Sequence, residues 1–227
     1  LSKMNDAVVA LWARVLQSVP ASRLFLKTKK LDDPAVCETT LQRFTAQGIE
    51  SGRLMLEGSS PRAELLAAYN RVDIALDPFP YGGGTTSFEV LWMAVPIITR
   101  KGDRFLSRCG QSLAFNADLV DWIAEDDDDY VAKAVMHTQD LKQLAALRAG
   151  LRERVLASPL FDAPRFARHL EAALREMWER WELTRKSGPA SPVPQPGFPG
   201  AMCQSSCRCA CADQAREVGR NVQLPSF

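Results

Sequence analysis

The sequence predicts an α/β fold in which helices cover both faces of a Rossmann-like parallel sheet. Short apolar stretches of strand length alternate with amphipathic stretches of helical length as far as residue 126, and only helical patterns follow. Such alternation is typical of right-handed βαβ units. The chain of 227 residues is long enough to bury a core, and its 28 basic and 27 acidic side chains nearly cancel. This balance disfavours a strongly basic nucleic-acid-binding protein.

Two hydrophobic periods define the N-terminal elements. Residues 6–19 place apolar side chains three and four positions apart, which predicts an amphipathic helix. Residues 23–27 form a short apolar run of strand length, and residues 53–57 repeat it. Between them, residues 34–47 predict a second helix that ends at Gly48, a typical C-terminal cap.

The next predicted element is a helix whose first residues are typical of a helix N-terminus. Ser60 is expected at the N-cap and Pro61 at the first helical position of a helix that runs to about Asn70. Residues 72–76 and 95–99 predict two further strands of the same sheet. The remaining predicted helices cover residues 85–94, 127–138, 140–157 and 163–183. We expect the last three of them to pack over the sheet edge.

The composition places a boundary near residue 187. Residues 187–227 hold six of the 14 prolines and four of the six cysteines without a regular period, which predicts a disordered tail after a domain of residues 1–186. The four cysteines of the tail are Cys203, Cys207, Cys209 and Cys211. Their spacing fits paired zinc ligands poorly, so we expect no metal site there. Cys37 and Cys109 are expected to be reduced and buried.

Other chemistry-bearing residues have structural interpretations. His137 and His169 lack a second ligand at helical spacing, so a metal role is not expected. The acidic residues 126–129 begin a predicted helix and complement its dipole. Trp178 and Trp181 repeat at packing intervals and are expected in the core. Charged residues interrupt every apolar run before the roughly 18 residues of a membrane span, so we expect a cytoplasmic protein.

A glycine-rich loop is the strongest candidate for chemistry. It follows the strand that ends at Leu76, contains glycines 82–84 and leads through Thr85 and Thr86 into a helix. The exposed N–H groups of a helix N-terminus bind anions, and the two hydroxyls add donors. Glu89, one turn later, could accept hydrogen bonds from a ribose. A plain glycine turn remains the alternative, and neither the dinucleotide fingerprint nor the P-loop lysine is present.

Residues 69–96, which include the stretch DPFPYGGGTTSFE, resemble the nucleotide-sugar-binding core of the O-linked N-acetylglucosamine transferase / SPINDLY family. Similarity extends over nearly all of residues 1–183 and includes residues 102–108 and 158–162. The resemblance implies the GT-B arrangement, in which two Rossmann-like domains face each other across a cleft. This chain resembles the C-terminal, donor-binding domain, and the acceptor groove and helical repeats of the N-terminal region have no counterpart here.

The resemblance also implies roles for individual residues. The positions that it assigns to the nucleotide sugar are Ser60, Pro61, Arg62, Gly84, Thr85, Thr86 and Glu89. Of these, Ser60 to Arg62 would flank the base, residues 84–86 would hold the diphosphate, and Glu89 would hold the ribose. Lys3 aligns with a catalytic lysine that neutralises the departing diphosphate. Gly84 stands where animal members of the family often have histidine, and Leu65 stands where the family usually has histidine.

The implied reaction is inverting transfer of N-acetylglucosamine from UDP-N-acetylglucosamine to serine or threonine hydroxyls of an acceptor protein. The resemblance implies no cofactor and no metal, and an acceptor bound through the missing N-terminal region, so we expect no turnover by residues 1–227 alone. No general base can be named, although Asp73 and Asp77 flank the loop. Two alternatives stay open: a GDP-fucose-dependent protein O-fucosyltransferase of the SPINDLY branch, or a non-catalytic nucleotide-binding module or scaffold.

Overall fold

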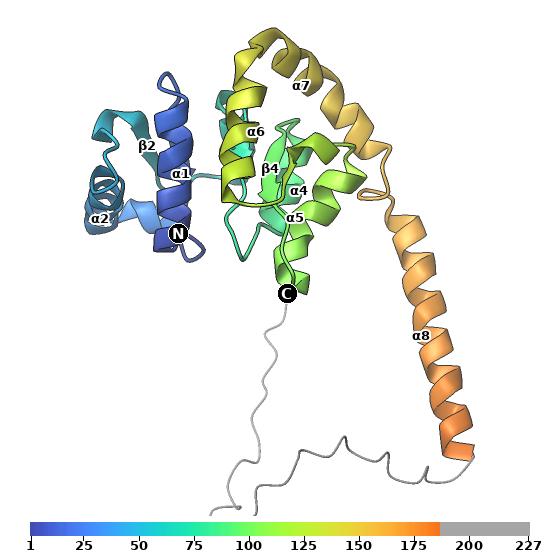
Figure 1. Cartoon of the computed structure of the whole chain (residues 1–227). Coiled ribbons are helices and arrows are strands. Elements are labelled where there is room, and N and C mark those ends of the chain that lie inside the picture. Colours follow the sequence, from blue (N-terminus) through green and yellow to red (C-terminus); the bar gives the residue numbers. More distant parts are fainter. Residues whose placement is uncertain (187–227) are drawn as a thin grey trace, which may run out of the picture. The chain divides into compact units, whose positions relative to one another are not determined.

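The computed structural model describes residues 1–186, and helices alternate with strands in the predicted order (Figure 1). Its elements are α1 (Asp6–Ser18), β1 (Leu24–Lys27), α2 (Pro34–Thr45), β2 (Leu54–Glu57), α3 (Arg62–Ala67), β3 (Ala75–Leu76), α4 (Thr85–Trp92), β4 (Ile97–Arg100), α5 (Phe105–Asn116), β5 (Ile123–Ala124), α6 (Asp127–Gln139), α7 (Leu141–Leu156) and α8 (Ala163–Lys186). The predicted disordered tail and its four cysteines lie outside the described residues.

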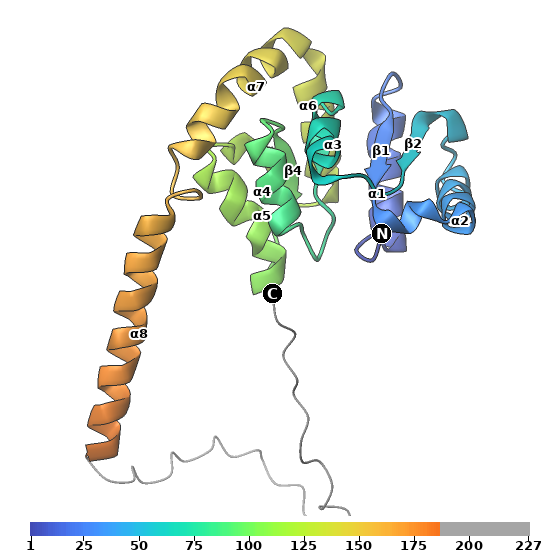
Figure 2. The same ribbon diagram turned by 180° about the vertical axis from the view of Figure 1, so that it is seen from behind.

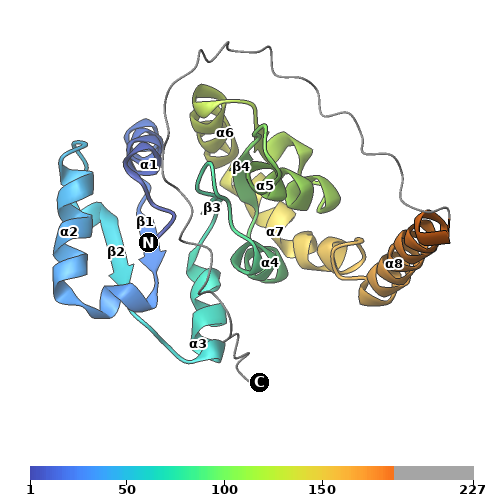
Figure 3. The same ribbon diagram turned by 90° about the horizontal axis from the view of Figure 1, so that it is seen from below.

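All described strands pair in parallel, as predicted, but they form two sheets instead of the single sheet expected. β1 pairs with β2, with Leu24 opposite Leu54. The second sheet has the order β3–β4–β5. Figure 3 shows β1 beside β2 and β3 beside β4. The two sheets stay separate because no strand among residues 1–186 pairs with both β1 and β3.

Two elements escaped the sequence analysis, namely α5 and β5. The buried face of α5 is built largely from small residues, including Ser107 and Gly110, so it lacks the apolar stripe on which helix prediction depends. β5 has only two residues, and its partner β4 contributes Thr99 and Arg100 to the pairing. Figure 2 shows α4 and α5 side by side next to β4.

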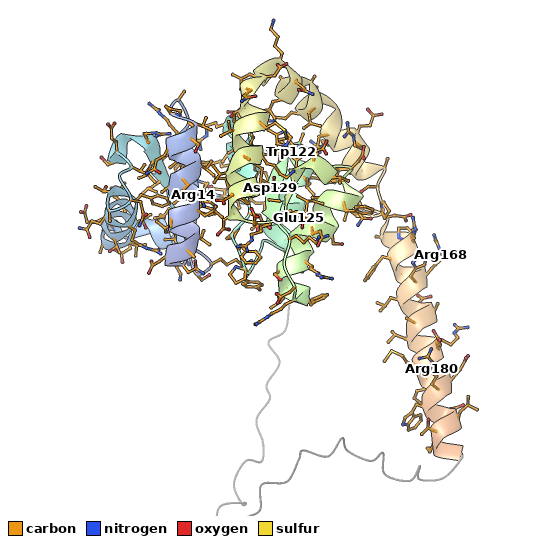
Figure 4. The ribbon with its side chains drawn as sticks, viewed as in Figure 1. Arg14, Trp122, Glu125, Asp129, Arg168 and Arg180 are labelled. Carbon is orange, nitrogen blue, oxygen red and sulfur yellow. The ribbon has the colours of Figure 1, made fainter. Side chains whose placement is uncertain are left out.

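Helix α1 packs against both α2 and α6. Its predicted apolar face is buried in the core, including Val8, Leu11 and Val15. Its polar side carries ion pairs to a helix on either side: Asp6 with Arg43 of α2 at 2.8 Å, and Arg14 with Asp128 of α6. Figure 4 marks Arg14 on α1 and Asp129 on the facing helix α6.

Of the three helices expected over the sheet edge, α6 packs on a face of the second sheet instead, and α7 packs on α4 and α6. α6 buries Tyr130 and contacts β4 and β5, and α7 buries Leu151 against α4. In Figure 3, α6 and α4 lie on opposite sides of β4, so helices cover both faces of this sheet. The acidic residues 126–129 begin α6, where the Asp126 carboxylate accepts a hydrogen bond from the Asp129 N–H, as their interpretation as a helix start predicts.

The expectation that Trp178 and Trp181 of α8 lie in the core was wrong. They are 58% and 50% exposed, and Arg168 and Arg180, labelled in Figure 4, lie along the same helix. The periodic pattern shows that α8 has an apolar face but does not show that another element covers it. The chain divides into two units, Leu1–Arg175 and Glu176–Phe227, and the glycine loop belongs to the first.

Two smaller expectations also changed. Cys37 and Cys109 are free thiols, as predicted, but they are half-buried, and each contacts a backbone carbonyl near it. The N-cap of α3 is Pro61 and the helix begins at Arg62, so Ser60 is not the cap. No helix within residues 1–186 is long and apolar enough to cross a membrane.

Candidate nucleotide-sugar site

The glycine loop lies at the carboxyl end of β3 and leads directly into α4. Gly84 is the N-cap of α4, and Thr85 and Thr86 are its first two residues, as the sequence predicts. All three residues are exposed. Because glycine has no side chain to cap the helix, no side-chain hydrogen bond occupies this N-terminus. The first turn of α4 therefore offers free backbone donors, two hydroxyls and the positive end of the helix dipole to an anion.

Gly84 leaves open space at the start of α4. A Cβ atom built at Gly84 would meet no other atom within 4 Å. The two preceding glycines differ, because a Cβ atom at Gly83 would lie 2.0 Å from the Ser87 hydroxyl oxygen and one at Gly82 would lie 2.6 Å from a carboxylate oxygen of Asp77. Close packing thus requires glycine at 82 and 83, whereas position 84 tolerates a side chain.

Asp77 holds the loop from its inner side. One carboxylate oxygen accepts a hydrogen bond from Gly83 N–H at 2.7 Å, and the other accepts one from the Thr99 hydroxyl at 2.9 Å. The Tyr130 hydroxyl donates to the Asp77 carbonyl oxygen at 3.1 Å. Burial raises the pKa of Asp77, while the hydrogen bonds from Gly83 N–H and the Thr99 hydroxyl and the positive charge of Lys3 oppose the rise. Asp77 points into the protein and is 3% exposed, and its carboxylate holds the loop and β4 together.

Lys3 lies against the same loop. Its Nζ donates a hydrogen bond to the Gly82 carbonyl oxygen at 2.5 Å and sits 4.0 Å from the centre of the Tyr81 ring. These contacts bring the N-terminal segment to a loop that is 79 residues away in the sequence. The structure therefore places the predicted catalytic lysine on the glycine loop, two residues before the predicted diphosphate-binding residues 84–86.

Arg62 and Glu89 come together from two different helices. Arg62 begins α3 and Glu89 lies in the second turn of α4, and their side chains form an ion pair at 2.5 Å. The Glu89 side chain is only 12% exposed, whereas that of Arg62 is 66% exposed. The nearby Glu89 carboxylate also contributes to the raised pKa of Tyr69, which is caused mainly by burial. The residues predicted to hold the ribose and to flank the base are thus adjacent.

Ser60 and Pro61 precede Arg62 in the loop after β2. The Ser60 hydroxyl oxygen is buried, and no atom of the described residues hydrogen-bonds to it. A buried hydroxyl without a partner is costly, so this group is suited to a hydrogen bond with a ligand.

Asp73, which precedes the loop in the sequence, lies outside β3. Its side chain is 80% exposed and lies 3.6 Å from Arg148.

Sequence reasoning missed an aromatic and cationic group beside the loop. The Arg100 guanidinium lies 4.1 Å from the centre of the Phe79 ring and forms an ion pair with Asp127 at 2.8 Å. Among the described residues, no three histidine, cysteine, aspartate or glutamate side chains are grouped so that they could hold a metal ion. The donors that the structure places at and beside the glycine loop are backbone amides, hydroxyls, the Lys3 ammonium group and the guanidinium groups of Arg62 and Arg100.

Comparisons with known proteins relate this chain to glycosyltransferases. A sequence model of glycosyl transferase family 41 matches residues 1–170. The Solanum lycopersicum protein named probable UDP-N-acetylglucosamine–peptide N-acetylglucosaminyltransferase SPINDLY is 37% identical over 186 residues, which cover 80% of this chain and 20% of that protein. The Caenorhabditis elegans UDP-N-acetylglucosamine–peptide N-acetylglucosaminyltransferase is 26% identical over 183 residues, which cover 80% of this chain and 16% of that protein.

A solved structure shows the same fold. A mutant of the Thermobaculum terrenum O-GlcNAc transferase superposes with a TM-score of 0.72 at 37% sequence identity, over 76% of this chain and 33% of that protein. The chain thus spans about a third of the solved structure and a smaller share of the curated relatives. With a family match over residues 1–170, the chain belongs to glycosyl transferase family 41.

Proposed function

We propose that this chain is the donor-binding part of a protein O-glycosyltransferase. The enzyme moves N-acetylglucosamine from UDP-N-acetylglucosamine to serine or threonine hydroxyls of an acceptor protein. The observation that carries the proposal is the hydrogen bond of Lys3 to Gly82 of the glycine loop, whose next residues lead into the uncapped N-terminus of α4. Relatives named N-acetylglucosaminyltransferases support the sugar, and the acceptor would bind mainly to the N-terminal region that the family resemblance implies.

The proposed chemistry is an inverting displacement. The acceptor hydroxyl attacks the anomeric carbon while the bond to the diphosphate breaks, so negative charge grows on the leaving phosphate. Fixed donors aimed at such charge stabilise the transition state more than the ground state. Here the α4 amides, the Thr85 and Thr86 hydroxyls and the Lys3 ammonium group would supply them. We therefore propose that the reaction proceeds without a resident cofactor or metal.

The nucleotide would lie across the loops that precede α3 and α4. Ser60, Pro61 and Arg62 would contact the base, and Glu89 would accept hydrogen bonds from the ribose hydroxyls. In the structure Glu89 pairs with Arg62, so the ribose would share this carboxylate with the guanidinium. This arrangement would join base and ribose recognition through a single ion pair.

Calorimetric titration with UDP and with GDP tests the proposal. We expect UDP to bind more tightly than GDP. Tighter binding of GDP would favour the second donor, GDP-fucose, which the resemblance to the SPINDLY branch keeps open. No binding of either nucleotide would overturn the assignment of the site.

The Thr85→Val, Thr86→Val double variant tests the phosphate contacts. Each lost hydrogen bond to a charged group costs about 1.5–3 kcal/mol, so UDP affinity should fall at least tenfold. Thr39→Val is the matched control, because Thr39 is also exposed on a helix but its hydroxyl donates to the Ala35 carbonyl oxygen of α2. Unchanged affinity in the double variant would remove both hydroxyls from the proposed mechanism.

A further inference from the structure

Asp77 joins the core of the second sheet to the glycine loop. Its backbone N–H donates to the Ile98 carbonyl oxygen at 2.9 Å, which fixes it at the end of β3 beside β4. Its carboxylate then reaches forward to Gly83 N–H and sideways to the Thr99 hydroxyl of β4. The residue therefore transmits the position of β4 to the loop through two hydrogen bonds.

The surroundings of the Asp77 carboxylate are shaped to hold it. A Cβ atom at Gly82 would lie 2.6 Å from one of its oxygens, and a Cβ atom at Gly110 of α5 would lie 2.4 Å from the same oxygen. Two glycines from different elements thus leave the space that the carboxylate fills. Its position is determined by close packing as well as by hydrogen bonds.

The glycine loop needs such an anchor. Glycine has the largest conformational freedom of all residues, so three consecutive glycines would be costly to order when a ligand binds. On its outer side the loop is held by Lys3, which donates to the Gly82 carbonyl oxygen, and on its inner side by Asp77, which accepts from Gly83 N–H. Because Gly84 follows directly as the N-cap of α4, any movement of Gly83 moves the amides and hydroxyls at positions 84–86.

We propose that Asp77 is a positioning residue that fixes the glycine loop before the ligand arrives, so that the N-terminus of α4 meets the diphosphate without reordering. It acts through Gly83 and does not touch the substrate. This inference rests on the function proposed above, because it concerns the same nucleotide diphosphate. The proposed role requires a hydrogen-bond acceptor for Gly83 N–H at position 77 and does not require a negative charge at that position.

The experiment compares Asp77→Ala and Asp77→Asn in the full chain. The first readout needs no ligand: hydrogen exchange of the Gly83 amide, followed by NMR, should accelerate in Asp77→Ala and stay slow in Asp77→Asn, which keeps an acceptor. The second readout is the ratio of the affinities for UDP and UMP. We expect this ratio to fall about tenfold in Asp77→Ala, since ordering the backbone of one residue on binding costs roughly that factor, and to be retained in Asp77→Asn.

Thr40→Val is the matched control. Thr40 is also 3% exposed, and its hydroxyl donates to the Val36 carbonyl oxygen of α2, so its loss removes a buried hydrogen bond that has no contact with the loop. We expect an unchanged affinity ratio in this variant. A ratio that falls equally in Thr40→Val and Asp77→Ala would mean that general destabilisation causes the loss, which would overturn the proposal.

The outcomes separate this inference from the proposed function. If the wild type binds no nucleotide, the proposed function fails, while protection of the Gly83 amide still shows whether Asp77 fixes the loop. If the wild type binds UDP and Asp77→Ala keeps both the slow exchange and the affinity ratio, the positioning role is wrong. If Asp77→Ala does not fold, the test is the ratio of UDP and UMP affinities in Asp77→Asn. A fall of this ratio would contradict the proposal that Asp77 acts through its hydrogen bond to Gly83 N–H.

Discussion

Lys3 contributes a single positive charge to the candidate site, and its removal should have a narrow effect. In Lys3→Met the side chain can still lie against the Tyr81 ring, but the charge next to Gly82 is lost. We expect UDP affinity to fall about tenfold, since a hydrogen bond to a charged group contributes roughly that factor. The melting temperature should change little. The loss should shrink at high salt, which titrations at two ionic strengths would measure.

The exposed Lys29 offers a control for the Lys3 variant. Lys29→Met removes the same charge from the 3-10 helix Lys29–Asp32, on a different segment. An equal loss of UDP affinity in both variants would indicate a long-range effect of net charge and would contradict a local role of Lys3.

Glu57 at the end of β2 sets a pH dependence of stability. Its carboxylate accepts hydrogen bonds from Arg71 at 2.7 and 2.9 Å and from Lys27 at 3.0 Å, which lower its pKa from 4.5 to about 2. Because the folded-state pKa lies below the unfolded value, the stabilisation is complete above pH 4.5 and is lost as the pH falls toward 2.

We therefore expect Glu57→Gln to melt at a lower temperature than the wild type at pH 7, with a difference that closes between pH 4.5 and 2. Thermal unfolding followed by circular dichroism over this range measures it. Glu50→Gln, at an exposed position before β2, should show no such convergence. A constant difference at every pH would mean that packing, not ionisation, causes the Glu57 effect.

Helix α5 depends on its close approach to β4. A Cβ atom at Gly110 would lie 2.1 Å from the Thr99 hydroxyl oxygen and 2.4 Å from a carboxylate oxygen of Asp77. We expect Gly110→Ala to lower the free energy of unfolding by about 1–3 kcal/mol, because the crowded atoms must shift. Gly150→Ala in α7, where nothing lies within 4 Å, should instead raise it by about 0.5–1 kcal/mol. Urea denaturation of both variants would measure the opposite signs.

The elements that the sequence predicts correctly are those whose packing face carries apolar residues at regular spacing. α1, α2 and α4 belong to this group, and the loop before α4 followed from its glycines and threonines. α5 was missed because Ser107 and Gly110 form much of its buried face. Its glycine is explained by the carboxylate of Asp77, a partner 33 positions earlier, which no local pattern can reveal.

The contacts that assemble the site were harder to predict than its residues. Thr85 and Thr86 are adjacent in sequence, so their common role follows from one helix start. Lys3 reaches Gly82 only because α1 packs beside α6 and brings the N-terminal segment to the second sheet. The resemblance to the family supplied Lys3 as a candidate, whereas its hydrogen-bond partner required the structure.

The strand orders of the two sheets match a doubly wound sheet that lacks one strand. Their strand orders, β2–β1 and β3–β4–β5, correspond to positions 3-2 and 4-5-6 of the order 3-2-1-4-5-6. One further parallel strand between β1 and β3 would join them, and no strand in residues 1–186 takes that place. In that order ligands bind beyond the carboxyl ends of the strands, where the loops before α3 and α4 meet.

The stability of the molecule should reside in residues 1–162. Among the described residues, those of the buried core lie between Met4 and Val155, and Phe161 packs its ring against Phe88 and Trp92. We therefore expect chains ending at Lys186 and at Asp162 to melt within about 2 °C of the full chain and to keep its affinity for UDP, since a change of 1 kcal/mol shifts the melting temperature of such a domain by about 2–4 °C. Differential scanning calorimetry measures both truncations. A much larger drop in the melting temperature of the chain ending at Lys186 would contradict a domain boundary at residue 186. If the melting temperature falls only in the chain ending at Asp162, part of the stability belongs to α8.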